Sequence, residues 1–163
     1  MNEHAPALFV ALEASNFAAA IRQSLFLYPL ANVGHILSLA CFAAAVGVMD
    51  VRLIGGLSAT APARVIGRAR RFAIAALCGL AVTGFMLFAA EASHVVLNPV
   101  FQVKMALIAV GIANVAIYEL AARRVVEALP PGAPMPTRAR LAGGFSLGLW
   151  LLVAACGRSI AYF

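Results

Sequence analysis

Charged side chains are scarce in this chain, and their scarcity excludes most soluble folds. Only 11% of its 163 residues are Asp, Glu, Lys or Arg, whereas soluble globular domains carry about 25%. Hydrophobic residues make up 64% of the chain. This composition predicts an integral membrane protein, because lipid tolerates few charges and each helix satisfies its own backbone polar groups.

The residues that common enzyme chemistry requires are also rare. Histidine and cysteine each occur only three times. The cysteines lie within apolar segments, where we interpret them as packing residues rather than as disulfides. The sequence shows no nucleotide-binding glycine loop and no nucleophile paired with a base. We therefore assign no catalytic residue, and a quinol-linked oxidoreductase is the one enzyme class left open.

Four apolar segments are long enough to cross a bilayer core, which takes about 20 residues. Ahead of them, residues 5–23 carry apolar side chains at helical spacing, which predicts an amphipathic helix lying in the membrane interface. We therefore predict an all-α fold: a single transmembrane domain over residues 1–163, built as an integral membrane four-helix bundle preceded by that short helix. The predicted spans are residues 24–51, 71–93, 102–122 and 141–162.

Basic residues are concentrated in two of the connections between these spans. Because positively charged loops stay in the cytoplasm, both connections are predicted to be cytoplasmic and both termini periplasmic, in a bacterial inner membrane. Topology thus accounts for the net charge of +6, and we expect no nucleic acid as a partner. The arginines concerned are Arg52, Arg64, Arg68, Arg70 and Arg71 in the first connection and Arg123, Arg124, Arg138 and Arg140 in the other.

Small and polar residues recur along one face of each predicted span. Such stripes mark the packed faces between membrane helices, whereas Leu, Ile, Val and Phe face lipid. Four stripes predict one common interior that holds the residues of a candidate site. These residues are Asn32 and His35 on the first span, Met86 and His94 on the second, Lys104 and Asn114 on the third, and Trp150 and Arg158 on the fourth.

His35 lies near the middle of the first span, and an ionisable residue there is by default a candidate for function. Imidazole is a common axial ligand of haem, and helical bundles build cofactor sites from inward side chains. We expect Lys104, Arg158 and Arg22 near the outer ends of their helices, where they would neutralise the propionates of a haem b. Asn32, Asn114 and Trp150 would contact the same cofactor.

The second axial ligand is open between three arrangements. His94 lies on the inward stripe of the second span and is our second metal-ligand candidate, because paired imidazoles are usual for an electron-transferring haem b. Met86 lies deeper on nearly the same face of that span. In the third arrangement the iron is five-coordinate on His35 alone.

Interpretations without a cofactor also exist. In a structural one, His35 hydrogen-bonds across the bundle to Asn114 or Ser146, and Lys104 and Arg158 extend to lipid headgroups. In another, His35, Asn114 and Lys104 bind a small anion in a transporter or permease-like module. The chain also fits a cofactor-free structural subunit of a larger membrane complex.

Two motifs add a resemblance to these patterns. They are His35 followed by the D-x-R-L-x-G stretch from Asp50 to Gly55, and the N-P-x-F-x-x-K turn from Asn98 to Lys104. In both, the chain resembles an uncharacterised family of small bacterial four-helix membrane proteins. That family is distantly similar to the copper-resistance D membrane domain and to HemJ-type protoporphyrinogen oxidases, which implies haem b on His35. The chain lacks the P-R-L motif and the tyrosine–histidine pair of HemJ proteins, and the methionine and histidine clusters of a copper carrier, so neither activity is carried over.

The leading hypothesis is a haem b membrane cytochrome that passes electrons between quinol in the membrane and an acceptor at the outer face. Membrane lipid and quinol are the expected partners. Because a four-helix unit has a limited interior and the fourth span carries Gly144 and Gly148 at small-xxx-small spacing, we also expect a homo-oligomer.

Overall fold

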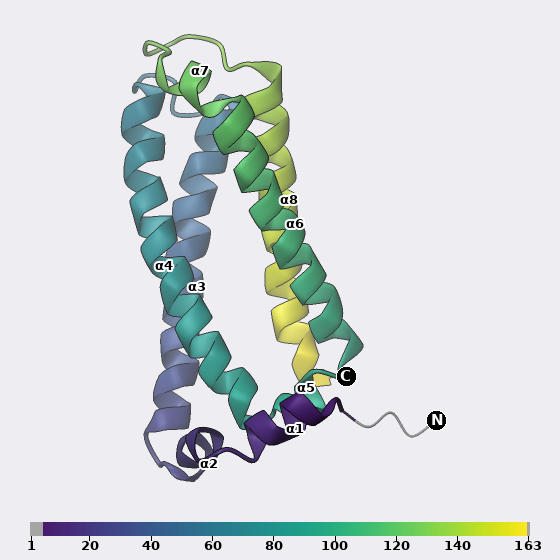
Figure 1. Ribbon diagram of the computed structural model, residues 1–163. Helices are drawn as coiled ribbons and strands as arrows, with labels where there is room; N and C mark the ends of the chain where they lie inside the picture. The colour runs from purple at the N-terminus through teal and green to yellow at the C-terminus, as the bar shows by residue number, and fades with distance from the viewer. Residues whose placement is uncertain (1–4, 163) are drawn as a thin grey trace.

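The computed structural model describes residues 5–162, which form helices joined by short connections (Figure 1). Four helices are long and apolar enough to cross a membrane, and the described residues contain no strand. The predicted all-α class with a four-helix bundle is therefore confirmed. The four helices are α3 (Leu27–Ile54), α4 (Pro62–Ala90), α6 (Pro99–Ala121) and α8 (Thr137–Ser159).

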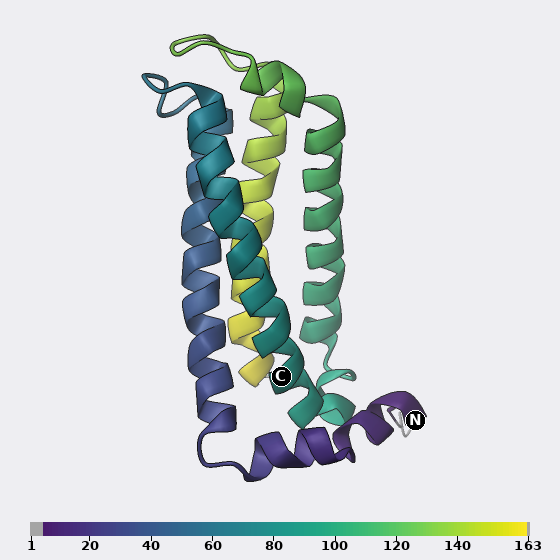
Figure 2. The ribbon, with the colours of Figure 1, turned by 60° about the vertical axis from the view of Figure 1, so that its left-hand side comes forward.

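Helices α3 and α4 pack along their length, and α8 packs against both α3 and α6 (Figures 1 and 2). Helix α6 meets α4 near the two ends of the bundle: Phe88 and Phe101 stack with their ring centroids 5.4 Å apart at one end, and Arg70 pairs with Glu119 at 2.9 Å at the other. Helix α8 is therefore the element that joins the α3–α4 pair to α6.

Glycines set how closely these helices approach. A Cβ atom on Gly79 of α4 would lie 2.6 Å from Ser38 Oγ of α3, and one on Gly143 of α8 would lie 2.8 Å from Leu53 Cβ and 3.1 Å from the Asp50 backbone oxygen. Small residues allow such backbone contact between helices in lipid, where burying apolar surface gives no driving force.

The end of the bundle that carries α7 (Arg123–Glu127) is held by ion pairs. Glu119 and Glu127 each accept from both Arg70 and Arg123, which links α4, α6 and α7. Helix α4 begins at Pro62 rather than near residue 71, because proline is suited to the first helical position. Its arginines therefore lie on a helix rather than in the predicted connection.

The opposite end is covered by α1 (Ala7–Glu13) and α2 (Asn16–Gln23), which lie across the bundle rather than along it (Figure 2). The prediction of one continuous helix over residues 5–23 was wrong, because the chain turns at Ser15, whose hydroxyl accepts from the Ala18 amide at 3.2 Å as an N-cap. The end of the bundle that α1 and α2 cover is the α2 end, and the end that carries α7 is the α7 end.

Two side chains tie α1 and α2 to the bundle. Glu13 accepts from the Ser93 amide at 2.7 Å and from its hydroxyl at 2.5 Å, where Ser93 belongs to α5 (Ala92–Val95). Arg22 donates to the backbone oxygens of Glu13 and Ala90, both at 2.9 Å. The short helices are thus anchored by polar contacts.

We predict that Gly143→Ala destabilises the bundle by about 1–3 kcal/mol, because the added methyl group overpacks the α3–α8 contact. Gly144→Ala is the matched control, since a Cβ there meets nothing within 4 Å and alanine raises helix propensity by up to about 1 kcal/mol. Unfolding in detergent followed by circular dichroism measures both. Equal stability of the two variants would contradict the close contact.

We also predict that α1 and α2 detach in acid. The Ser93 hydroxyl and then its amide lower the pKa of Glu13 from its ordinary value of 4.5. A lowered folded-state pKa contributes stability that is complete above the unfolded pKa and is lost as pH falls through the folded one. A spin label at exposed Ala20 should therefore gain mobility only below about pH 4.5.

Glu13→Gln should release the Ala20 label already at neutral pH, because the amide weakens the contact to Ser93. Glu91→Gln is the control, as it removes an exposed carboxylate at the same end. If the label is equally mobile in both variants, Glu13 does not anchor these helices.

Candidate functional site

His35 on α3 faces α4 and is held there by Thr83. Its Nδ1 lies 2.9 Å from Thr83 Oγ1, and the threonine hydroxyl donates to the Gly79 carbonyl oxygen at 2.6 Å. A hydroxyl has a single proton to donate. We therefore infer from this network that Nδ1 carries the ring proton and donates it to Thr83, which leaves the lone pair on Nε2.

The helices around this pair are too close to admit a ligand between them. A Cβ on Gly84 would lie 3.1 Å from His35 Cε1, and one on Gly34 would lie 3.3 Å from Thr83 Cγ2. Any group bound to His35 Nε2 must therefore lie outside the contact between α3 and α4.

Lys104 of α6 lies at the same depth as His35. Phe42 of α3 packs on Trp150 of α8, with ring centroids 4.7 Å apart, and Trp150 lies over Gly111 of α6. About two helical turns from Phe42 toward the α2 end, α3 carries His35. At the same distance in the same direction, α8 carries Gly157 and α6 carries Lys104.

A direct contact between Lys104 and Gly157 agrees with this common level of the three residues. Lys104 Nζ is 3.4 Å from where a Cβ atom would lie on Gly157, and the side chain is partly buried. Among the described residues, no carboxylate lies within ion-pair distance of its ammonium group. The prediction that Lys104 lies near the outer rim was wrong, because α6 begins at Pro99 and places this residue more than one turn inside the bundle.

The other two predicted cations do not join Lys104. Arg158 is exposed, donates to the Tyr162 hydroxyl at 2.5 Å and lies over that ring. Arg22 is engaged by the backbone oxygens of Glu13 and Ala90. The three basic residues therefore do not converge on a common anion.

Three further predicted site residues also lie away from His35. Asn32 is exposed, because the buried position of α3 at this level is Ala31. Asn114 donates to the Ala142 backbone oxygen at 3.3 Å, toward the α7 end. Trp150 packs against Phe42 in the middle of the bundle. The interpretation in which His35 bonds to Asn114 or Ser146 was wrong, since its partner is Thr83.

The two candidates for a second ligand differ in depth. Met86 is partly buried on α4, about one turn from Thr83 toward the α2 end. His94 is exposed on α5, beyond Ala90, where α4 ends about 10 Å from the Thr83 level. The structure does not bring His94 to His35.

The residues that sequence reasoning missed are Thr83 and an aromatic layer. On the α2 side of His35, Phe88 of α4 stacks on Phe101 of α6 and meets Phe9 of α1 edge-on. The sequence does carry a pattern that points to Thr83, because Gly79 precedes it by one turn and Gly84 follows it directly. The aromatic layer had none, since its members come from three separate helices.

Few side chains that could bind a metal ion lie at the level of His35. Within residues 5–162 there is no group of three or more His, Cys, Asp and Glu side chains that could hold a metal ion. A bare zinc ion takes three or four protein ligands, whereas iron already held by a porphyrin takes only one or two axial ones. Among the described residues, the side chains around His35 thus form no multi-ligand metal site of the zinc kind.

The chain was then compared with known proteins. A family model described as a family of unknown function (DUF6644) matches residues 10–163. The chain belongs to this family. The predicted membership of an uncharacterised family is thereby confirmed, while no curated protein and no solved structure matches. Membership in DUF6644 brings no activity with it, so the function of this protein has to be argued from the site around His35.

Proposed function

We propose that this protein binds haem b through His35 and carries electrons between membrane quinol and an acceptor at the outer face of a bacterial inner membrane. The observation that carries the proposal is the hydrogen bond from His35 Nδ1 to Thr83. Histidines that bind a metal generally donate their other ring proton to an oxygen, which fixes the ring and its tautomer. The resemblance to the copper-resistance D and HemJ proteins supports the same ligand.

The residues around His35 fit such a cofactor. Thr83 holds the ring, and Gly84 leaves room for it. On the α7 side, Phe42 and Trp150 close the bundle with apolar surface, and on the α2 side Phe88 and Phe101 do the same. When bound, haem iron supplies one-electron chemistry, and these side chains would exclude water from it.

Lys104 gives the proposal its second support. A partly buried ammonium group without a carboxylate partner is unfavourable in an apolar bundle. A haem propionate would supply the missing negative charge, and the lysine would hold the carboxylate near the level of His35. We therefore retain Lys104 as a propionate partner, while Arg22, Asn32, Asn114 and Arg158 no longer belong to the proposed site.

The same lysine also favours a second candidate function. A small anion bound between His35 and Lys104 would equally satisfy the ammonium group, as in a transporter or permease-like module. Asn114 would not take part, because it lies toward the α7 end and bonds to Ala142. The two candidates differ in whether the protein absorbs visible light.

We predict that detergent-purified protein, expressed with adequate haem, shows a Soret band and sharp α and β bands after reduction with dithionite. His35→Ala should lose them, because the axial nitrogen is gone. Asn32→Ala, at an exposed position one turn away, is the matched control and should keep them. His94→Ala should also keep them, since His94 lies outside this level.

A colourless wild-type protein with an intact helical circular dichroism spectrum would overturn the haem proposal. The anion-binding function would then remain as the candidate. It would be tested by titrating a small anion into the wild-type protein and into Lys104→Gln and comparing the binding.

We further predict that Lys104→Gln lowers the midpoint potential of the bound haem, because a nearby positive charge stabilises the reduced form. At an effective dielectric constant of about 20, the effect is of the order of 1 kcal/mol, or roughly 40 mV for a one-electron couple. Redox titration followed at the α band measures it. Lys104→Arg should restore the potential, and an unchanged potential in Lys104→Gln would show that the lysine lies away from the cofactor.

A further inference from the structure

Asp50 is a buried carboxyl group at the place where α3 crosses α8. Its side chain is 3% exposed, and its backbone oxygen lies 3.1 Å from where a Cβ atom would lie on Gly143. Ser146, about one turn further along α8, is 5% exposed. Among the described residues, Asp50 Oδ2 has no hydrogen-bond partner.

The nearest arginine in the sequence does not neutralise Asp50. Arg52 is fully buried, but its guanidinium group donates to the backbone oxygens of Gly56 and Thr60 at 3.4 and 3.3 Å. Arg52 therefore holds the loop between α3 and α4, and among the described residues it forms no ion pair with Asp50.

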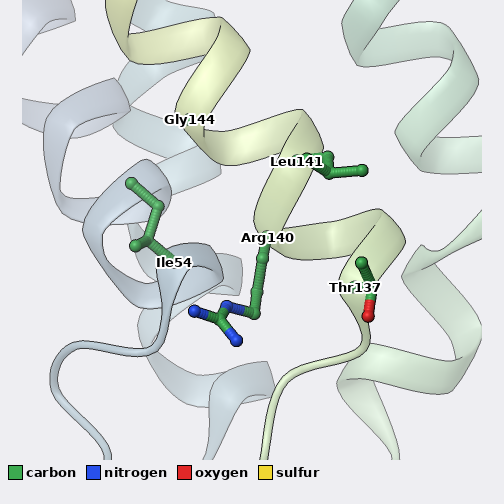
Figure 3. Close-up of a pocket in the computed structure, with 5 residues that line it drawn as sticks. All are labelled: Ile54, Thr137, Arg140, Leu141 and Gly144. Atoms are coloured by element: carbon green, nitrogen blue, oxygen red, sulfur yellow. The ribbon is translucent and has the colours of Figure 1, made fainter.

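Among the described residues, the ionisable groups on the other packed helices form no ion pair with Asp50. Arg70 of α4 pairs with Glu119 and Glu127, and Tyr118 of α6 is uncharged at neutral pH. Arg140 of α8 is exposed and extends into the space between the ends of α3 and α8 (Figure 3). An ionised Asp50 would thus be a buried charge without a counter-ion, which is strongly unfavourable.

We propose that Asp50 is a proton-binding site: at neutral pH it holds a neutral carboxylic acid, buried at the α3–α8 contact together with Ser146. This inference is independent of the haem proposal, because it rests on residues about 22 Å further along α3. The site belongs to the α7 end, which the charge distribution predicts to face the cytoplasm.

A groove beside Asp50 offers the proton a route to the surface. It has a volume of about 280 Å³ and is lined by Ile54, Thr137, Arg140, Leu141 and Gly144 (Figure 3). Ile54 lies about one turn beyond Asp50 on α3, and Gly144 directly follows Gly143 on α8. The groove therefore ends next to the helix contact that buries the carboxyl group.

Infrared spectroscopy tests the protonation state directly. Wild-type protein at neutral pH should show the carbonyl stretch of a protonated carboxylic acid, shifted in D2O, and Asp50→Asn should lack it. Glu119→Gln is the control and should keep the band, because Glu119 is an ion-paired carboxylate. Absence of the band in the wild type between pH 6 and about 8 would overturn the proposal.

A hydrophobic carbodiimide gives a second test on the wild-type chain. The neutral acid adds across the carbodiimide: its proton goes to one nitrogen, its oxygen bonds to the central carbon, and rearrangement leaves a stable N-acylurea with no leaving group. Mass spectrometry should find this adduct on the peptide that contains Asp50 and not in Asp50→Asn. If Na⁺ suppresses the labelling at constant pH, Asp50 binds a metal cation rather than a proton, and the proposal is overturned.

The groove is tested by filling it. Gly144→Leu should slow the labelling of Asp50 at least several-fold while leaving the infrared band in place, since a Cβ atom there meets nothing within 4 Å and the rest of the side chain can extend into the groove. Gly148→Leu, one turn further along the same exposed face and outside the groove, is the matched control. Equal labelling rates in the two variants would overturn the groove as the route.

Discussion

The structure depends on the close approach of α3 to its two neighbours. Glycines at 79 and 84 let α4 approach α3, and Gly143 lets α8 approach it at the other end. Helices in lipid gain little from burying apolar surface against each other, so their association relies on such backbone contact and on buried hydrogen bonds. The same contacts hold three polar residues of α3 against its neighbours: Ser38 and His35 lie against α4, and Asp50 lies against α8.

His35 shows how this constraint produces a candidate site. On an isolated helix the imidazole would turn freely, but here the glycine at 84 leaves space for one edge of the ring and Thr83 accepts its proton. The ring is then held against α4 through Nδ1 and Cε1. The orientation that a ligand requires is thus supplied by backbone packing, before any cofactor is bound.

Sequence reasoning was reliable where it needed only composition and periodicity. The four spans and His35 as an inward polar residue follow from apolar length and from the 3.6-residue repeat. Depth was less predictable, because it depends on where each helix begins. Lys104 was misplaced since α6 starts at Pro99 rather than at residue 102. Asn32 was misplaced because its neighbour Ala31 is the buried residue at that level of α3.

Contacts between distant segments were out of reach for a different reason. Thr83 and His35 lie 48 residues apart in the sequence, and a stripe of small residues on each helix does not say which residues meet. The break at Ser15 could have been found, since serine is a strong N-cap. The apolar spacing, however, continues on both sides of Ser15 and favours a single helix.

The two polar sites on α3 are arranged so that they can act separately. His35 and Asp50 are about 22 Å apart along one rigid helix, with the Phe42–Trp150 contact between them. At that distance two unit charges interact by less than about 1 kcal/mol at an effective dielectric constant of 20. Electrostatic coupling is therefore weak, and any stronger coupling has to be mechanical. Helix α8 is the element placed to transmit it, because Gly157 lies beside Lys104 and Gly143 lies against Asp50. A tilt of α8 that admits water to the carboxyl group would also shift the wall opposite His35.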